Sequence, residues 1–122
     1  MIDRKYAYLI DFDGVINSYT SGWDEDKGGA TWLPDPPVPG VKEALEELSQ
    51  RFRIVIFTTR AKTSEGAKAV CDWLTKYDIY HDKVTNKKEA GLLLIDDRAI
   101  TFKGDWTQTL EDIRSFKHWM KK

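Results

Sequence analysis

Apolar side chains form short continuous runs along this chain, and polar residues bound each run. The runs cover residues 6–10, 53–57 and 92–95. Runs of this length predict buried strands, and the nearly all-apolar run at 53–57 is typical of a central one. The run at 92–95 is also predicted to be a core strand, and a shorter strand is predicted at 83–85.

Between these runs, apolar residues recur at helical spacing. Residues 41, 44, 45 and 48 form one stripe after Pro39-Gly40, and residues 67, 70, 71 and 74 form a second after the candidate N-cap Ser64. A final helix is predicted after 104–106, with Leu110, Ile113, Phe116 and Met120 facing inward. Three tryptophans at helix positions are expected to pack in the core: Trp73, Trp106 and Trp119. Strands that alternate with helices predict an α/β fold with a mostly parallel sheet.

Residues 17–39 interrupt this alternation. Gly28-Gly29 and four prolines at 34, 36, 37 and 39 exclude a long helix there. Fewer than 40 residues separate the first motif from the second strand, and about 30 separate that strand from Lys88. A cap domain needs roughly 50 residues. We therefore expect a single domain over 1–122, with 17–39 as a flap beside the site.

Polar residues follow three of the predicted strands. They are Asp11 and Asp13, then Thr58, Thr59 and Arg60, then Asp96, Asp97 and Arg98. The carboxyl ends of parallel strands share one edge of a sheet, and ligands bind at that edge. These groups are therefore expected to converge although they lie far apart in the chain.

Four converging carboxylates favour a hard cation. Oxygen ligands of this kind match Mg²⁺, which often bridges protein carboxylates to a phosphate. The positive charge would offset the cost of bringing like charges together at a buried strand end. A carboxylate can also attack phosphorus, and a lysine and a hydroxyl can stabilise the phosphoryl oxygens. Candidates for these last two groups are Lys87 or Lys88, and Thr58.

The order of these motifs resembles the haloacid dehalogenase superfamily of phosphatases. D-F-D-G-V comes first, an apolar strand ending in threonine second, a lysine third, and an apolar strand ending in D-D last. The four motifs span residues 11–97, most of the chain. The resemblance implies a Rossmann-like, three-layer α/β/α sandwich without a cap domain. It also implies Mg²⁺-dependent hydrolysis of a phosphomonoester through an aspartyl-phosphate.

The resemblance also implies roles for the first motif. Asp11 would be the nucleophile and a metal ligand. Asp13 would be the general acid/base, and its backbone carbonyl would give a second metal contact. An acid at position 13 implies phosphatase or phosphotransferase chemistry, because a poor alkoxide leaving group needs a proton.

The later motifs receive roles in the same way. Thr58 would bind the phosphoryl oxygens, and Asp96 and Asp97 would hold Mg²⁺ directly or through water. Lys88 is preferred over Lys87 as the motif-three lysine. Family members often have proline directly after this lysine, whereas this chain has glutamate.

Substrate binding is assigned to five further residues. Arg60 resembles the T-x-R form of motif two in the phosphatase domains of polynucleotide end-processing enzymes, and a guanidinium suits bidentate phosphate binding. A surface arginine beside a helix is the alternative. Gly14 and Thr59 adjoin the catalytic residues. Trp23 and Trp32, in the flap, either pack there or stack on a substrate.

Composition narrows the partners and compartment. The chain has 122 residues, is 41% hydrophobic and 32% charged, and carries a net charge of −1. Nucleic acid is thus a possible partner that net charge does not imply, and a phosphorylated substrate is the expected one. A single cysteine, Cys71, excludes an internal disulfide framework. No run approaches a membrane span, and the N-terminus lacks a signal-peptide pattern, so a cytoplasmic protein is expected.

Two other functions stay open beside the general phosphatase. One is a phosphatase that processes 3′-phosphate ends of nucleic acids, and the other is a catalytically idle phosphate-binding or interaction module on the same fold. A receiver domain of two-component signalling also uses acids, threonine, lysine and Mg²⁺. Its acidic pair follows the first strand and its lysine the last, however, and this chain has the opposite order.

Overall fold

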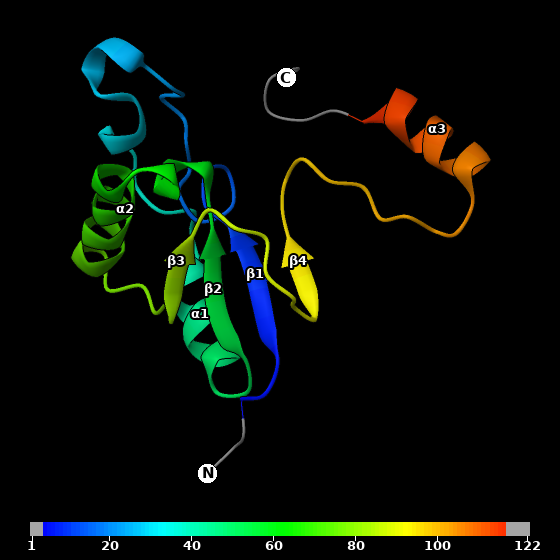
Figure 1. The fold of residues 1–122 in the computed structure, drawn as a ribbon, viewed down its shortest axis with the longest axis horizontal. Coiled ribbons are helices and arrows are strands. Elements are labelled where there is room, and N and C mark those ends of the chain that lie inside the picture. The colour runs from blue at the N-terminus through cyan, green and yellow to red at the C-terminus, as the bar shows by residue number, and fades with distance from the viewer. Residues whose placement is uncertain (1–3, 117–122) are drawn as a thin grey trace.

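The computed structural model describes residues 4–116, which contain a four-stranded parallel sheet and three α-helices (Figure 1). The strands are β1 (Ala7–Asp11), β2 (Arg53–Phe57), β3 (Lys83–Thr85) and β4 (Leu93–Ile95), and their order is β3-β2-β1-β4. The α/β class and the parallel sheet are therefore confirmed. β1 begins and ends one residue later than predicted, so Asp11 is its last residue.

The register aligns the carboxyl ends of the strands. Ile10 lies opposite Ile56 on one side and Ile95 on the other. Asp11 therefore lies at the level where β4 ends and Asp96 begins. The backbone N–H of Thr58, directly after β2, donates to the carbonyl of Thr85 at 2.9 Å, which continues the β2–β3 pairing to the same edge.

Helices α1 (Val41–Ser49) and α2 (Ser64–Lys76) cover one face of the sheet (Figure 1). Both helices start as predicted, although Thr63 rather than Ser64 caps α2, through a bond from the backbone N–H of Gly66 at 3.1 Å. The main core cluster joins alternate strand residues to both helices; it contains Ile10, Phe12, Ile16, Leu45, Ile54, Ile56, Val70, Trp73, Leu74 and Ile79. Trp73 is therefore in the core, as predicted.

A connecting segment, not a helix, covers the other face. Ala7, Leu9 and Val55 are buried there. Residues 86–92 cross this face between β3 and β4 (Figure 1). The backbone N–H of Leu92 donates to the carbonyl of Ala7 at 2.8 Å, and a Cβ on Gly91 would lie only 2.2 Å from Cδ1 of Leu9. The chain thus crosses in close contact with β1.

The prediction of a core strand at 92–95 is wrong. Leu92, Leu93 and Leu94 are 58%, 48% and 40% exposed. β4 is the last strand in the sheet order, so it has a neighbouring strand on one side only. An apolar run indicates a strand, but it does not show whether other elements will cover that strand.

The predicted packing of the final helix is also wrong. Helix α3 (Trp106–Ser115) packs against no other described helix or strand, and it stands apart from the sheet in Figure 1. Leu110, Ile113 and Trp106 are exposed, and Phe116 is partly exposed. Trp119 and Met120 lie outside the described residues. The helical spacing is correct, but the long connection at 96–105 carries the apolar stripe away from the sheet.

Residues 17–39 form an irregular segment, as predicted, and we call it the flap. It contains two short 3-10 turns, Glu25–Lys27 and Gly29–Thr31. The indole N–H of Trp73 donates to the carbonyl of Asp35 at 3.0 Å, and the Asp35 carboxylate accepts two bonds from Ser21. The flap is therefore anchored to α2 by specific hydrogen bonds. Among residues 4–116, no helix is long and apolar enough to cross a membrane.

Two leucine variants distinguish the packed helix from the unpacked one. Leu74→Ala in α2 should lower the free energy of unfolding by about 2–5 kcal/mol, because Leu74 is fully buried. Leu110→Ala in α3 removes the same atoms from an exposed site and should change it by about 0.5 kcal/mol or less. Urea unfolding measures both values. Equal losses would mean that α3 packs against the body of the protein.

Candidate functional site

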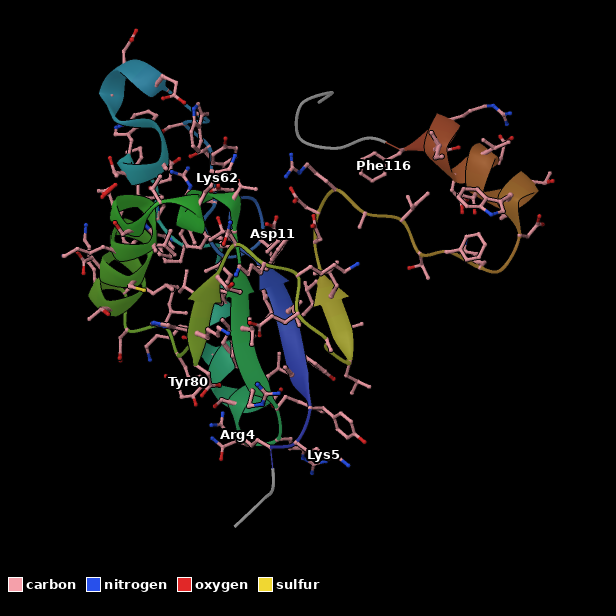
Figure 2. All side chains as sticks on the ribbon, in the orientation of Figure 1. Arg4, Lys5, Asp11, Lys62, Tyr80 and Phe116 are labelled. Carbon is pink, nitrogen blue, oxygen red and sulfur yellow. The ribbon has the colours of Figure 1, made fainter. Side chains whose placement is uncertain are left out.

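Three carboxylates meet at the carboxyl edge of the sheet. Asp11 ends β1, and Asp96 and Asp97 directly follow β4; each offers a carboxylate oxygen, and these oxygens all lie within 4.8 Å of one another. Figure 2 shows Asp11 at this edge, with Arg4 and Tyr80 at the opposite end of the sheet. The parallel pairing of β1 with β4 brings these acids together across most of the chain. The expected convergence of these three is therefore confirmed.

Asp11 is held in an unfavourable position for an isolated charge. Its side chain is 8% exposed, and its Oδ2 atom has no hydrogen-bond partner. Burial, reinforced by the charge of Asp96, raises the pKa of Asp11 to about 7. Oδ1 of Asp97 is also buried without a partner. Because unpaired buried acceptors are costly, this cluster suits a bound cation.

Gly14 makes room for this cluster. Its φ of +87° lies in the left-handed region that favours glycine, and a Cβ on it would lie 2.3 Å from Oδ2 of Asp97. The backbone N–H of Gly14 donates to the carbonyl of Asn17 at 2.8 Å and fixes the turn. The glycine of the D-x-D-G motif is therefore needed for the close approach of Asp97. Its assignment to substrate binding stays a prediction.

Asp13 lies outside the acidic cluster and is paired with Arg60. Nε of Arg60 donates to the two carboxylate oxygens of Asp13 at 2.8 and 3.1 Å, and Nδ2 of Asn17 donates at 2.9 Å. The expected positive charge at the end of β1 is thus present for the second acid. Arg60 is 1% exposed, so its interpretation as a surface arginine is wrong.

The rest of the Arg60 guanidinium faces the flap. Nη1 donates to the carbonyls of Gly29, Ala30 and Trp32 at 3.1, 3.1 and 3.2 Å. The guanidinium carbon also lies 4.9 Å from the ring centroid of Trp23 and 5.8 Å from that of Tyr19. Arg60 therefore connects Asp13 to the flap backbone.

Thr58 is buried at the end of β2. Its Oγ1 accepts the backbone N–H of Arg60 at 3.2 Å and caps the 3-10 turn η3 (Thr59–Lys62). The hydroxyl proton remains able to donate to a phosphoryl oxygen, so the catalytic role of Thr58 stays a prediction beside this capping role. Thr59 is exposed, and Lys62 lies on the outer side of the same turn (Figure 2).

The lysine assignment stays open between Lys87 and Lys88. Both are exposed in the segment that crosses the sheet face. Lys83 forms an ion pair with Glu89, the residue that stands where family members often have proline.

Sequence reasoning gave no role to several residues that the structure places near the site. Arg98, directly after the acidic pair, is the cation whose charge lowers the pKa of Asp11 against the raising effects. Asn17 is 1% exposed and orients Asp13, as noted above. Burial alone would raise the pKa of Asp35, but the bonds from Ser21 outweigh it and the pKa is lowered. Proximity to D-x-D and D-D was the available signal for Asn17 and Arg98; nothing in the sequence indicated Asp35.

The two flap tryptophans are arranged differently. Trp23 is 45% exposed, and its indole N–H donates to Glu25 at 3.0 Å. Trp32 is partly buried, and Nζ of Lys27 lies 5.2 Å from its ring centroid. Each ring thus takes part in flap packing, while Trp23 also keeps a surface that a planar substrate group could contact.

Comparison of the chain with protein-family models, curated proteins and solved structures finds no match, so the superfamily resemblance rests on the motifs themselves. The fold and the acidic cluster define an α/β protein with a candidate cation site at the carboxyl edge of its sheet.

Gly14→Ala should weaken Mg²⁺ binding by about 10–100-fold, because the new methyl group displaces Asp97. Gly22→Ala is the matched control. Gly22 also has a positive φ, of +71°, but nothing lies within 4 Å of its Cβ position. Titration calorimetry measures both affinities. Equal weakening in the two variants would trace the effect to backbone strain and not to Asp97.

The raised pKa of Asp11 predicts how stability depends on pH without divalent cations. The folded chain binds a proton at Asp11 up to about pH 7, whereas the unfolded carboxyl loses it near 3.8. This contribution to stability is complete below pH 3.8 and is lost as pH rises toward 7.

Urea unfolding in chelator from pH 4 to 8 measures this dependence. The free energy of unfolding should fall more steeply for the wild-type chain than for Asp11→Asn. Asp26→Asn, at an exposed acid of the flap, should follow the wild-type curve. Coincident curves for wild type and Asp11→Asn would contradict the assigned environment of Asp11.

Proposed function

We propose that this protein is a Mg²⁺-dependent phosphomonoester hydrolase that acts through an aspartyl-phosphate on Asp11. The observation that carries the proposal is the buried carboxylate of Asp11, whose unpartnered oxygen lies in a three-acid cluster at the carboxyl edge of a parallel sheet. Ligands of α/β sheets bind at that edge. The motif order supports the same function independently.

The donor set suits the proposed cation. Asp11, Asp96 and Asp97 would hold it, and the resemblance adds the main-chain carbonyl of Asp13. All of these ligands are hard oxygens, which Mg²⁺ prefers. Bound Mg²⁺ would neutralise charge on the carboxylates and on the phosphate oxygens. The two buried oxygens without partners in Asp11 and Asp97 support this fit.

The chain's own residues would perform the transfer. A carboxylate oxygen of Asp11 attacks phosphorus, and the bond from phosphorus to the leaving alkoxide oxygen breaks. Asp13 gives that alkoxide its proton. Asp13 then takes a proton from water, which attacks phosphorus and releases Asp11 and inorganic phosphate.

The positive charge for the phosphoryl oxygens would come from Lys88, or from Lys87, and Thr58 would donate a hydrogen bond. Arg60 is less suited to this task than its motif suggested, because its Nε and Nη1 atoms already bind Asp13 and flap carbonyls. The partly exposed Trp23 supports contact with a planar group on the substrate. An oligonucleotide end therefore remains a second candidate substrate beside small phosphates.

The direct test is turnover of p-nitrophenyl phosphate with Mg²⁺. We expect activity that chelator removes, and a loss of about 10⁴-fold or more in kcat for Asp11→Asn, since an amide is a poor nucleophile. Asp26→Asn should retain activity. Wild-type turnover in Asp11→Asn, or chelator-resistant turnover, would contradict the mechanism.

The same assay separates the substrate classes. A 3′-phosphorylated oligonucleotide, mononucleotides and hexose phosphates are compared by kcat/KM. Preference for the oligonucleotide would support end processing. Absence of turnover on every phosphate, with Mg²⁺ binding intact, would leave the idle binding module as the function.

A further inference from the structure

We propose that Arg60 is a positioning residue that holds the Asp13 carboxylate and the flap as one unit, so that the acid is aligned only while the flap is docked. The kinetic part of this inference rests on the proposed function. The structural part, a mechanical link between residue 13 and residues 29–32, does not.

The Asp13 side of this link is specific. Nε of Arg60 contacts both carboxylate oxygens, the closer at 2.8 Å, and the Arg60 side chain is 1% exposed, against 21% for Asp13. A guanidinium removed from water needs full pairing, so breaking this contact leaves a buried unpaired charge. Nδ2 of Asn17 fixes one Asp13 oxygen from another direction. The carboxylate is thus held in one orientation.

The flap side uses the same guanidinium. One nitrogen, Nη1, receives three consecutive-turn carbonyls, from Gly29, Ala30 and Trp32. Trp23 packs against the guanidinium at 4.9 Å from its ring centroid. Because the two sets of contacts share one rigid planar group, undocking the flap removes the support of Nε as well.

The backbone of Arg60 is fixed independently of its side chain. Thr58 caps the turn through the Arg60 N–H, and a Cβ on Gly66 would lie only 1.9 Å from the Arg60 carbonyl oxygen. Helix α2 therefore presses directly on this residue. A lysine at position 60 would keep the charge but would lose the planar fork that reaches both partners.

A misaligned acid has a characteristic kinetic effect. Alkyl phosphates need a proton on the leaving oxygen, whereas 2,4-dinitrophenyl phosphate does not. Arg60→Lys should lower kcat for an alkyl phosphate by about 10²-fold or more, with little change for the dinitrophenyl ester and no change in KM. If Arg60 instead bound the substrate phosphate, KM would rise for both esters alike, and the inference would be overturned.

Hydrogen exchange tests the link without turnover. In Arg60→Lys, amide exchange over 23–33 should become faster, while exchange in the core strand β2 should not change. Asp13→Asn should loosen the same segment from the other side, because it removes the ion pair. This second variant keeps the test decisive if Arg60→Lys fails to fold. Lys62→Ala, exposed on the same 3-10 turn, is the matched control and should change neither rates nor exchange.

The outcomes of the two proposals are distinct. A wild-type chain without turnover would contradict the proposed function, and flap exchange in the two variants would still decide the link. An active wild-type chain whose Arg60→Lys and Asp13→Asn variants show unaltered flap exchange would overturn the inference alone. A loss of rate independent of the leaving group would overturn it too.

Discussion

The structure depends on how two acids are accommodated at the end of one buried strand. Asp11 and Asp13 follow Leu9 and Ile10, which are almost fully buried, so neither carboxylate can rely on bulk water. The two are accommodated differently. Asp13 has a buried cation, Arg60, whereas Asp11 has two further acids, Asp96 and Asp97, beside it. This asymmetry separates a neutralised site from a site that still requires positive charge.

The same asymmetry organises the surrounding segments. Arg60 neutralises Asp13 and also binds three flap carbonyls, so the irregular residues 17–39 are attached to the edge of the sheet. Asp35 and Trp73 attach the far part of the flap to α2. The Asp11 side has no comparable cover among the described residues, because β4 is an edge strand and α3 stands away from it. The site is thus closed on the flap side and open on the β4 side.

Several elements could be predicted from local pattern because their side-chain periodicity and their packing agree. The strand at 53–57 is apolar throughout and is central, and the stripes at 41–48 and 67–74 lie on helices that cover the sheet. The strand at 92–95 and the helix that begins at Trp106 were recognised as elements, but their burial was predicted wrongly. Periodicity reports which face of an element is apolar, and only contacts with other elements determine whether that face is covered.

For the site, the sequence by itself determined which acids follow which strands, and parallel pairing then required Asp11, Asp96 and Asp97 to meet. The sequence also supplied Gly14, the residue without a side chain that lets Asp97 approach. Only the tertiary structure decided that Arg60 belongs to Asp13 and the flap, because this ion pair joins residues 47 positions apart through a turn that α2 presses into place. Charge partners between distant segments depend on packing distances, and no local spacing in the chain encodes those distances.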